Sequence, residues 1–367
     1  MGNVTTIKTR RQAVNKGSQL SNSVLNCVAT ELVQVYSDQN TKAILWTQNN
    51  DGIQSIIRLA LDTQIGKLSA EDLDIDQLLA TKTEIDSYFG SSAGTQASFT
   101  FDNSEQSAQV IIKTIADALN CQAYRQFSTI KLKFEKPNVP RMLFTFRSKA
   151  PESDTIQRKS LTKEYPTGVE IKWLDTSGQQ KSIKVPDDSQ QNYKNIELHC
   201  IDNQAQAKWR AWREYYKLTY GLITYNSELS PESKLLLIND VIQSSDDTRI
   251  YPSAGYIISI SDSTLTLSQD VSFESGKDYT IILKDRDGTI ESFGATGTGT
   301  TDTVIIDATP TIEIYTGINE TKTEFYFCED TEANAQTWLI QSVSFSEKYN
   351  KVSAINYNQI YYSKDGT

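Results

Sequence analysis

Histidine and cysteine are scarce in this chain of 367 residues, which contains one histidine and four cysteines. The histidine, His199, stands beside Cys200, and adjacent residues of a strand point to opposite faces, so the two are not expected to form a catalytic pair. No CxxC or CxH spacing of a zinc site occurs, so no metal or other cofactor is expected. We expect four small, buried hydrophobic residues instead, namely Cys27, Cys121, Cys200 and Cys328.

Long apolar runs and an excess of positive charge are also missing. No run approaches the roughly 18 apolar residues that cross a bilayer, and the longest candidate, IIRLAL, contains Arg58. The first residues lack the apolar segment of a secretory signal. The net charge is −10, whereas tight non-specific binding to duplex DNA needs Lys and Arg to neutralise phosphates. We therefore expect a soluble protein with an acidic surface past which DNA can slide.

Residues 283–292, LKDRDGTIES, are the stretch that most resembles a functional motif, a calcium-binding loop. Placing Gly288 at loop position 6 puts Leu283 at position 1 and Gly294 at position 12, where a calcium loop needs oxygen ligands. The flanking runs, DYTIILK and TIESF, alternate like strands, and Asp-Gly between such runs is a strong hairpin signal. The motif predicts a hairpin turn without a metal site.

Two helices are predicted early in the chain. Residues 51–65 have Asp51 as a candidate N-cap and apolar residues on one face. Residues 69–90 begin with Ser69, a candidate cap, and end at Gly90, a residue that commonly ends helices. Before these helices, and after an N-terminal arm of residues 1–40, AILWT reads as a short buried strand.

A third helix, opened by Asp102 or Ser104, is followed by two predicted strands, CQAYRQ and TIKLKFEKP, joined near Ser128. Prolines and a polar run after residue 137 indicate a boundary. A second block begins with residues 167–186, a predicted hairpin that turns at residues 177–178.

The helix predicted for residues 202–220 carries an aromatic stripe with cations between the rings. The stripe is Ala205, Trp209, Trp212, Tyr216 and Tyr220, and the cations are Lys208, Arg210, Arg213 and Lys217. Rings and cations together are typical of single-stranded nucleic-acid binding. The rings share one face and the cations lie off it, however, so we favour rings packed against a sheet with the cations in solvent and predict no nucleic-acid site.

Short strand patterns at 8 to 12 residue intervals fill the chain after residue 222 and predict a barrel or sandwich. They include TIEIYTG and KVSAINYNQIYY. The predicted fold is β-dominated α+β, with few helices and a strand-rich C-terminal barrel. We expect a helix-bearing domain at 41–150, a second domain with the aromatic helix at 151–235, and a barrel-like domain at 236–367 that can interleave in space with the other two.

Four segments, in order, resemble the host-specificity or tip-attachment protein J family, the tail-tip proteins of long-tailed phages. They are NSEQSAQVIIKTIADALNCQAYRQFSTIKLKFEKPNVPRMLFTFRSKAPES, TGVEIKWLD with WRAWREYYKLTY, GYIISISDSTLTLSQDVSFESGKDYTIILKDRDGTIES, and SAINYNQIYYSKDGT. The resemblance implies a multi-domain baseplate hub with tube-type domains, which forms a homotrimer at the distal end of the tail tube in the virion. It implies closure of the tube before infection and opening for DNA after attachment.

The same resemblance implies a set of partners and a location. The partners are other tail proteins (distal tail or tube proteins, tape measure and tail fibres), the host cell surface indirectly, and viral DNA that passes through the lumen without specific binding. The protein would be made in the bacterial host cytoplasm. The chain lacks the family's long N-terminal domain and C-terminal receptor-reading modules, which indicates a piece of a longer hub or a phage that divides these functions between chains.

Two other function classes compete with this reading. A carbohydrate-binding adhesin would use the β-rich half and the 18 tyrosines, but most tyrosines fall at alternating strand positions typical of buried faces. An enzyme would need two carboxyls held across a cleft. The carboxylate pairs Glu71 with Asp72 and Asp285 with Asp287 have no recognisable catalytic context, so we expect no enzymatic activity and no catalytic residues.

Overall fold

The computed structural model contains nineteen strands and four α-helices within its described residues. Among those residues, no helix is both long and apolar enough to span a membrane. The described ranges are 33–45, 50–63, 65–98, 107–126, 128–162, 164–175, 179–190, 192–201, 203–245, 253–317, 322–330 and 337–367. The β-dominated α+β class predicted from sequence is therefore confirmed.

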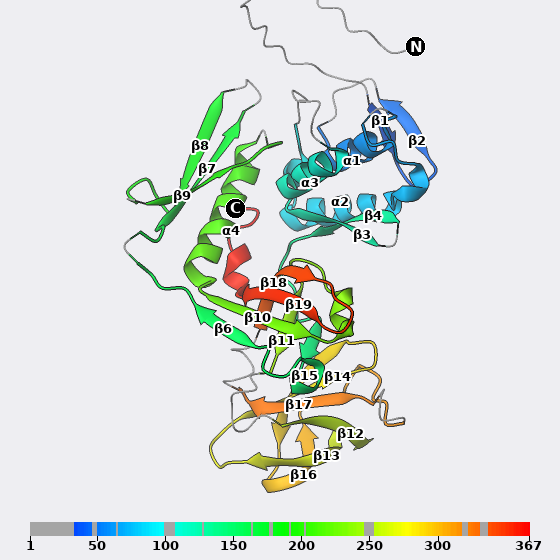
Figure 1. Ribbon diagram of the computed structural model, residues 1–367, viewed down its shortest axis with the longest axis vertical. Coiled ribbons are helices and arrows are strands. Elements are labelled where there is room, and N and C mark those ends of the chain that lie inside the picture. The colour runs from blue at the N-terminus through cyan, green and yellow to red at the C-terminus, as the bar shows by residue number, and fades with distance from the viewer. Residues whose placement is uncertain are drawn as a thin grey trace, which may run out of the picture.

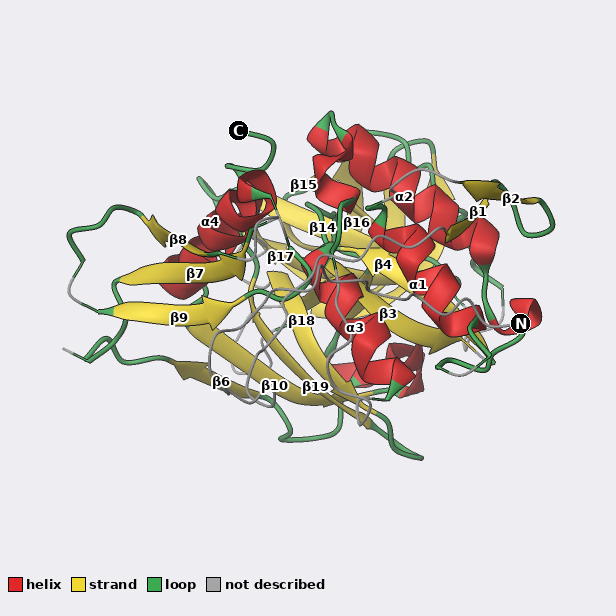
Figure 2. Ribbon diagram, turned by 90° about the horizontal axis from the view of Figure 1, so that it is seen from above, coloured by secondary structure: helices red, strands yellow, loops and turns green. Residues whose placement is uncertain are grey.

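The molecule is elongated, with three layers of structure along its long axis. Figure 1 shows a barrel at one end, a six-stranded sheet in the middle, and two units side by side at the other end. One unit holds three helices and the other holds a three-stranded sheet with the fourth helix. The view from above in Figure 2 separates these two units clearly.

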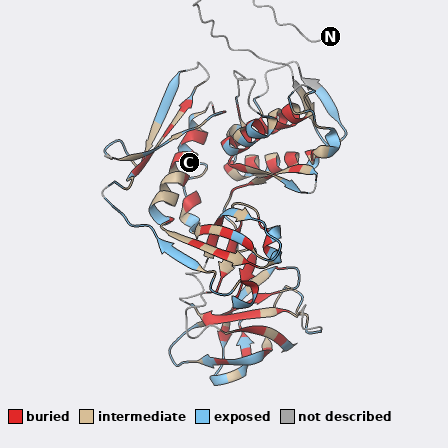
Figure 3. Ribbon diagram, in the orientation of Figure 1, coloured by how far each residue is buried: buried red, intermediate tan, exposed pale blue. Residues whose placement is uncertain are grey.

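The helix-bearing unit contains helices α1 (Gly52–Leu61), α2 (Ile75–Phe89) and α3 (Ala108–Ala118). They pack against the antiparallel pair β3 (Cys121–Gln126) and β4 (Thr129–Phe134). The pair β1 (Val33–Tyr36) and β2 (Lys42–Leu45) lies beside α1. The apolar faces of the helices are buried, as the colouring of Figure 3 shows.

The predicted helix ends at Asp51 and Gly90 hold, whereas Ser69 caps a 3-10 turn and α2 is capped by Asp74 instead. The Asp51 carboxylate accepts hydrogen bonds from the Ile53 and Gln54 amides, and α1 then ends at Leu61 rather than residue 65. The predicted helix 69–90 is interrupted: a 3-10 turn, Ala70–Asp72, is followed by α2. The break arises because the Asp74 amide donates to Ile130 O (3.2 Å), which ties this segment to β4.

Two other predictions in this region concern residues that lie partly outside the described ranges. Asp102 and Ser104 lie outside them, and α3 begins at Ala108 behind Ser107, whose hydroxyl accepts from the Val110 amide. The AILWT strand is present as β2, although Ala43 is exposed, and residues 46 and 47 are outside the described range.

The neighbouring unit is a three-stranded sheet in the order β8-β7-β9, covered by helix α4 (Gln204–Tyr220). Strands β7 (Gly168–Leu174) and β8 (Gln180–Val185) form the predicted antiparallel hairpin, while β9 (Tyr193–Glu197) pairs with β7 in parallel. The predicted turn at 177–178 lies outside the described residues. One hydrophobic core joins this unit to the three helices through α4.

The six-stranded sheet has the order β5-β11-β18-β19-β10-β6. Its strands come from all three ranges that the sequence suggested as domains, so neighbours in this sheet are distant in the chain. The strands are β5 (Met142–Phe144), β6 (Thr155–Arg158), β10 (Ile223–Leu229), β11 (Val241–Ser244), β18 (Thr337–Ser344) and β19 (Asn350–Asn356).

The barrel is closed by six strands in the order β12-β13-β16-β15-β14-β17, which confirms the predicted C-terminal barrel. It occupies residues 253–329 rather than all of 236–367, because β18 and β19 leave it to join the six-stranded sheet. Its strands are β12 (Ser253–Ser261), β13 (Thr264–Phe273), β14 (Tyr279–Lys284), β15 (Ile290–Thr296), β16 (Gly299–Ile306) and β17 (Glu324–Glu329).

Two predicted strands have other conformations. TIEIYTG (311–317) is not a strand; the Thr311 amide is held by the Glu291 carboxylate at 2.8 Å while Ile312 and Ile314 pack on the barrel core. The end of KVSAINYNQIYY forms the 3-10 turn η8 (Gln359–Tyr362) rather than continuing β19. The turn forms because Asn358 caps it and its two tyrosines are buried.

Strand β5 connects the barrel to the sheet by burying both of its faces. Met142 and Phe144 belong to the core of the six-stranded sheet. Leu143 points the other way and packs in a cluster with the barrel residues Ala254, Ile282, Tyr326 and Cys328. The alternation of a strand thus places one short run of three residues in two cores.

Candidate functional site

The DRDG stretch is a hairpin turn, as predicted. Strands β14 and β15 pair on either side of it, and Gly288 has φ +87, a conformation that other residues rarely adopt. The Asp285 carboxylate accepts hydrogen bonds from the Asp287 and Thr289 amides, both at 2.9 Å. Asp285 therefore acts as the hydrogen-bond acceptor that organises the turn.

The described cysteines lie in different parts of the fold, in β3, after β9 and in β17. His199 is exposed just after β9, whereas its neighbour Cys200 is buried, and burial raises the pKa of the Cys200 thiol to about 12. Cys121 and Cys328 are also buried. Across the part of the chain that the structure describes, no group of three or more His, Cys, Asp or Glu side chains is placed to hold a metal ion.

The carboxylate pair Glu71 and Asp72 lies in the 3-10 turn before α2. Asp72 accepts from the Ser69 amide (2.9 Å) and hydroxyl (2.8 Å) in a capping box, and these hydrogen bonds lower the pKa of Asp72. Its partner Glu71 is exposed. The arrangement shapes the turn and does not hold two carboxyls across a cleft.

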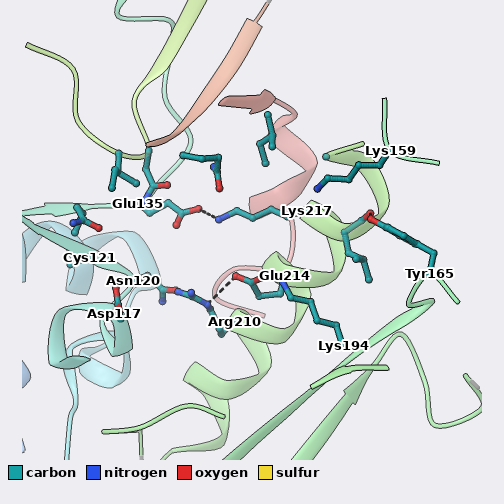
Figure 4. A pocket seen from close by; sticks show the side chains of 17 residues that line it. Asp117, Asn120, Cys121, Glu135, Lys159, Tyr165, Lys194, Arg210, Glu214 and Lys217 are labelled. Carbon is teal, nitrogen blue, oxygen red and sulfur yellow. Dashed lines mark hydrogen bonds and ion pairs between the residues drawn. The ribbon is translucent and has the colours of Figure 1, made fainter. Parts of the chain in front are cut away.

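The strongest candidate site is a polar cavity of about 320 Å³. It lies where the helix-bearing unit, the three-stranded sheet with α4, and the six-stranded sheet meet. Its walls come from α3 and β3, from α4, from β9, and from the six-stranded sheet. Figure 4 shows that charged side chains from these elements point toward one another. They are Asp117, Glu135, Lys159, Lys194, Arg210, Glu214 and Lys217.

Glu135, at the end of β4, lies on the inner wall of the cavity. Its carboxylate accepts from Lys217 Nζ at 2.5 Å and from the Tyr362 hydroxyl at 3.3 Å. Burial would raise the pKa of Glu135, but the positive charges of Lys217, Arg213 and Arg210 outweigh it and lower that pKa. Glu135 is thus an ionised group held in a fixed ion pair.

Glu214 forms the second ion pair and is shared by two cations. Arg210 Nε lies 3.3 Å from Glu214 Oε1, and Lys194 Nζ lies 3.0 Å from Glu214 Oε2. Burial opposes ionisation of Glu214, yet Arg210, Lys217 and Lys194 together lower its pKa to about 2. Arg210 Nη1 also donates to Asn120 Oδ1 at 3.0 Å, which joins α4 to the end of α3.

Next to the cavity, the guanidinium of Arg213 is almost completely buried, with its side chain 1% exposed. It makes a bidentate pair with Asp365, with Nε–Oδ1 at 2.9 Å and Nη2–Oδ2 at 2.6 Å, and Nη1 donates to Glu135 O at 3.0 Å. The Tyr88 hydroxyl donates to the same Asp365 carboxylate at 2.8 Å. This network ties α2, β4, α4 and the last residues of the chain together.

The prediction for the aromatic helix was partly wrong. Trp209 is buried, and its ring stacks on Phe89 of α2 with centroids 4.2 Å apart, while Tyr216 packs near the six-stranded sheet. Tyr220, however, is exposed, and Arg213 is buried instead of lying in solvent. The reason is that α4 is covered on more than one side, so its charged face is also internal.

The charged face of α4 was the signal that sequence reasoning missed. Its charged residues recur at the spacing of one helix face, as Arg210, Arg213, Glu214 and Lys217. Their partner Glu135 lies about 80 residues earlier in FEKP, and nothing local connects the two. Chemically, the cavity presents ion pairs and cations for polar recognition, and Glu135 and Glu214 are held by positive groups. Burial raises the pKa of the third carboxylate, Asp117.

Comparison with known proteins gives remote structural similarity only. No protein-family model matches the sequence, and no curated protein sequence matches it. A chain from the virion of a native gene transfer agent particle matches with a TM-score of 0.38 and 10% identity, over 71% of this chain and 41% of that one.

Two tail proteins are similar at the same level. The tail protein from Neisseria meningitidis MC58 matches with a TM-score of 0.28 and 9% identity, over 65% of this chain and 60% of that one. The 43 kDa tail protein of prophage MuSo2 from Shewanella oneidensis matches with a TM-score of 0.29 and 7% identity, over 72% of this chain and 56% of that one. The chain spans 41% to 60% of the lengths of these three tail and virion proteins.

Proposed function

We propose that the chain is a structural protein of a long-tailed phage tail, and specifically a baseplate hub of the protein J type. In this role it closes the distal end of the tail tube and opens for DNA passage after host attachment. The observation that carries the proposal is the ordered set of segments that resemble this family. In the structure, residues 103–153 include α3 to β5, and 167–220 include β7 to α4. Residues 255–292 run from β12 into β15 of the barrel, and 353–367 hold the end of β19 with η8.

The geometry of the polar cavity supports a structural rather than a catalytic role. Glu135 and Glu214 are each held by cations, and such pairing fixes the side chains in place. A general acid or base needs a pKa near the working pH, whereas that of Glu214 is lowered to about 2. The ion pairs connect elements from separate parts of the chain, as expected of a rigid component of a larger assembly.

The proposed protein is a homotrimer at the distal tail tip of the virion. It contacts distal tail or tube proteins, the tape measure and tail fibres, and meets the host surface through them. Its net charge of −10 suits a conduit through which DNA passes without specific binding.

The test is the mass of the purified chain in solution, measured by light scattering over a range of concentrations. A homotrimer has three times the monomer mass of 41.2 kDa, and a rise toward that value with concentration supports the hub. A monomer at all concentrations contradicts assembly by this chain alone. A panel of glycans then tests the alternative, a carbohydrate-binding adhesin without catalysis.

The adhesin would need aromatic rings on its surface to stack on sugars. Among the tyrosines that the structure describes, only Tyr220 is exposed, at 41%. The remaining described tyrosines are buried or half-buried, and two phenylalanines, Phe146 and Phe345, are exposed in separate parts of the fold. The described tyrosines therefore provide no aromatic surface that favours this alternative over the hub.

A further inference from the structure

The polar cavity holds more positive than negative side chains, and the excess lies on one side. Four cations and three carboxylates line it, a difference of one. On the inner wall, Glu135 is matched by Lys217. On the other side, Glu214 is shared by Lys194 and Arg210, and the Asp117 carboxylate also interacts with the charge of Arg210.

Lys159 is the fourth cation that lines the cavity. Among the described residues, no carboxylate lies within ion-pair distance of its ammonium, and Figure 4 shows this side chain reaching into the cavity. Its backbone is fixed, because the Lys159 amide donates to Leu222 O at 2.8 Å. With Lys217 matched by Glu135, the cations Lys159, Lys194 and Arg210 remain beside the two carboxylates Glu214 and Asp117, an excess of one positive charge.

These three cations come from different structural units. Lys159 follows β6 of the six-stranded sheet, Lys194 belongs to β9 of the three-stranded sheet, and Arg210 is on α4. Donors that approach from several directions suit a tetrahedral oxyanion, whose oxygens can each accept a hydrogen bond. The two oxygens of a carboxylate ligand lie in one plane, so they could not accept from cations in several directions.

We infer that the cavity is a binding site for a small tetrahedral oxyanion, of the phosphate class, held by Lys159, Lys194 and Arg210. The bound anion neutralises the excess charge and links the six-stranded sheet, the three-stranded sheet and α4. A ligand that binds only the folded state stabilises it, so occupancy strengthens the junction between these units. This inference is independent of the proposed role in a phage tail.

The test is calorimetric titration of the full chain with inorganic phosphate, with sodium chloride adjusted to keep the ionic strength constant. The wild type is expected to show saturable binding and a rise in melting temperature. Lys159→Met removes one charge-assisted contact and is expected to weaken binding at least about tenfold. Lys159 is exposed, so this variant is expected to fold.

Lys208→Met is the matched control, because Lys208 is an exposed lysine of α4 that does not line the cavity. It is expected to bind phosphate like the wild type. Absence of saturable heat in the wild type overturns the inference, as does equal affinity in the Lys159 and Lys208 variants, which indicates a general ionic effect. Replacing phosphate by a phosphomonoester then separates the sources: tighter binding of the ester identifies an organic phosphate, and equal binding identifies the free ion.

Discussion

At the scale of single residues, the buried charge of Arg213 joins α4 to β4 and to Asp365 near the end of the chain. Arg213 is 1% exposed and its partner Asp365 is 5% exposed, so both charges have lost most of their hydration. Such a pair is costly to break because the remaining partner stays charged in an apolar environment. The surrounding rings of Phe89, Phe134 and Tyr362 make that environment apolar.

Asp365→Asn is expected to lower the free energy of unfolding by about 3 kcal/mol, since it removes the carboxylate that pairs bidentately with the buried Arg213. Urea denaturation followed by tryptophan fluorescence measures the change, because Trp209 and Trp212 lie on the same helix. The control is Asp188→Asn at an exposed position, where a change within about 0.5 kcal/mol is expected. Equal stabilities of the two variants would show that the pair contributes little.

Glu214 is expected to make stability depend on pH on the acid side. Its pKa is lowered from 4.5 to about 2 in the folded protein, so its contribution is present above about pH 4.5 and is lost as the pH falls toward 2. Glu214→Gln should therefore be less stable than the wild type at pH 7, by at most about 3 kcal/mol, with a difference that shrinks toward pH 2.

Urea unfolding at several pH values between 7 and 2.5 measures this effect. Glu347→Gln changes an exposed glutamate in the turn between β18 and β19 and serves as the control. A gap between wild type and Glu214→Gln that stays constant across this range would contradict the proposed linkage.

At the scale of elements, helix ends show where local sequence was sufficient. Gly90 ends α2 in the left-handed conformation, with φ +65, and a Cβ built there meets no atom within 4 Å. The predicted stop at this residue therefore rests on backbone conformation alone. The start of the same helix depended instead on the contact of Asp74 with Ile130 of β4.

Gly90→Ala is expected to cost about 1–2 kcal/mol, since an L side chain is strained at this φ while no clash adds to the cost. Gly90→Asn should cost less, because asparagine tolerates the left-handed region. Thermal unfolding of both variants beside the wild type measures the order. If alanine and asparagine cost the same, the backbone explanation is wrong.

At the scale of the whole molecule, the relation of the barrel to the sheet depends on β5 and a few contacts beside it. Leu143 enters the cluster with Ala254 and Ile282, and Lys284 of the barrel pairs with Glu232 at 2.6 Å. Arg147 lies over the Tyr256 ring at 4.7 Å. The barrel is therefore docked through a small apolar contact bordered by charged and cation–π contacts.

Leu143→Ala is expected to destabilise this junction by about 2–5 kcal/mol, through lost burial and the cavity that remains. Hydrogen exchange of β14 and β17 in the barrel should accelerate relative to exchange in α1 and α2. Val139→Ala, at a position 82% exposed, is the control and should leave both unchanged. Equal acceleration in all elements would indicate one cooperative unit rather than a separable junction.

Much of the secondary structure could be predicted because its causes are local. Asp51 caps α1 through amides two and three residues away, and Asp285 with Gly288 forms its turn within five residues. The alternating runs after residue 252 close into a barrel because each strand carries its own apolar face. Such patterns depend on neighbours in sequence, which the sequence shows directly.

The polar site could not be predicted, because its members are brought together only by tertiary packing. Glu135 meets Lys217, and Arg213 meets Asp365 across 152 residues. No periodicity records such pairs, and a charged helix face in isolation is typical of a solvent-exposed surface. By itself the sequence determined the acidic balance, the strand-rich class and the local caps and turns. Only the tertiary structure decided that α4 is buried on its charged face, because that depends on which distant elements cover it.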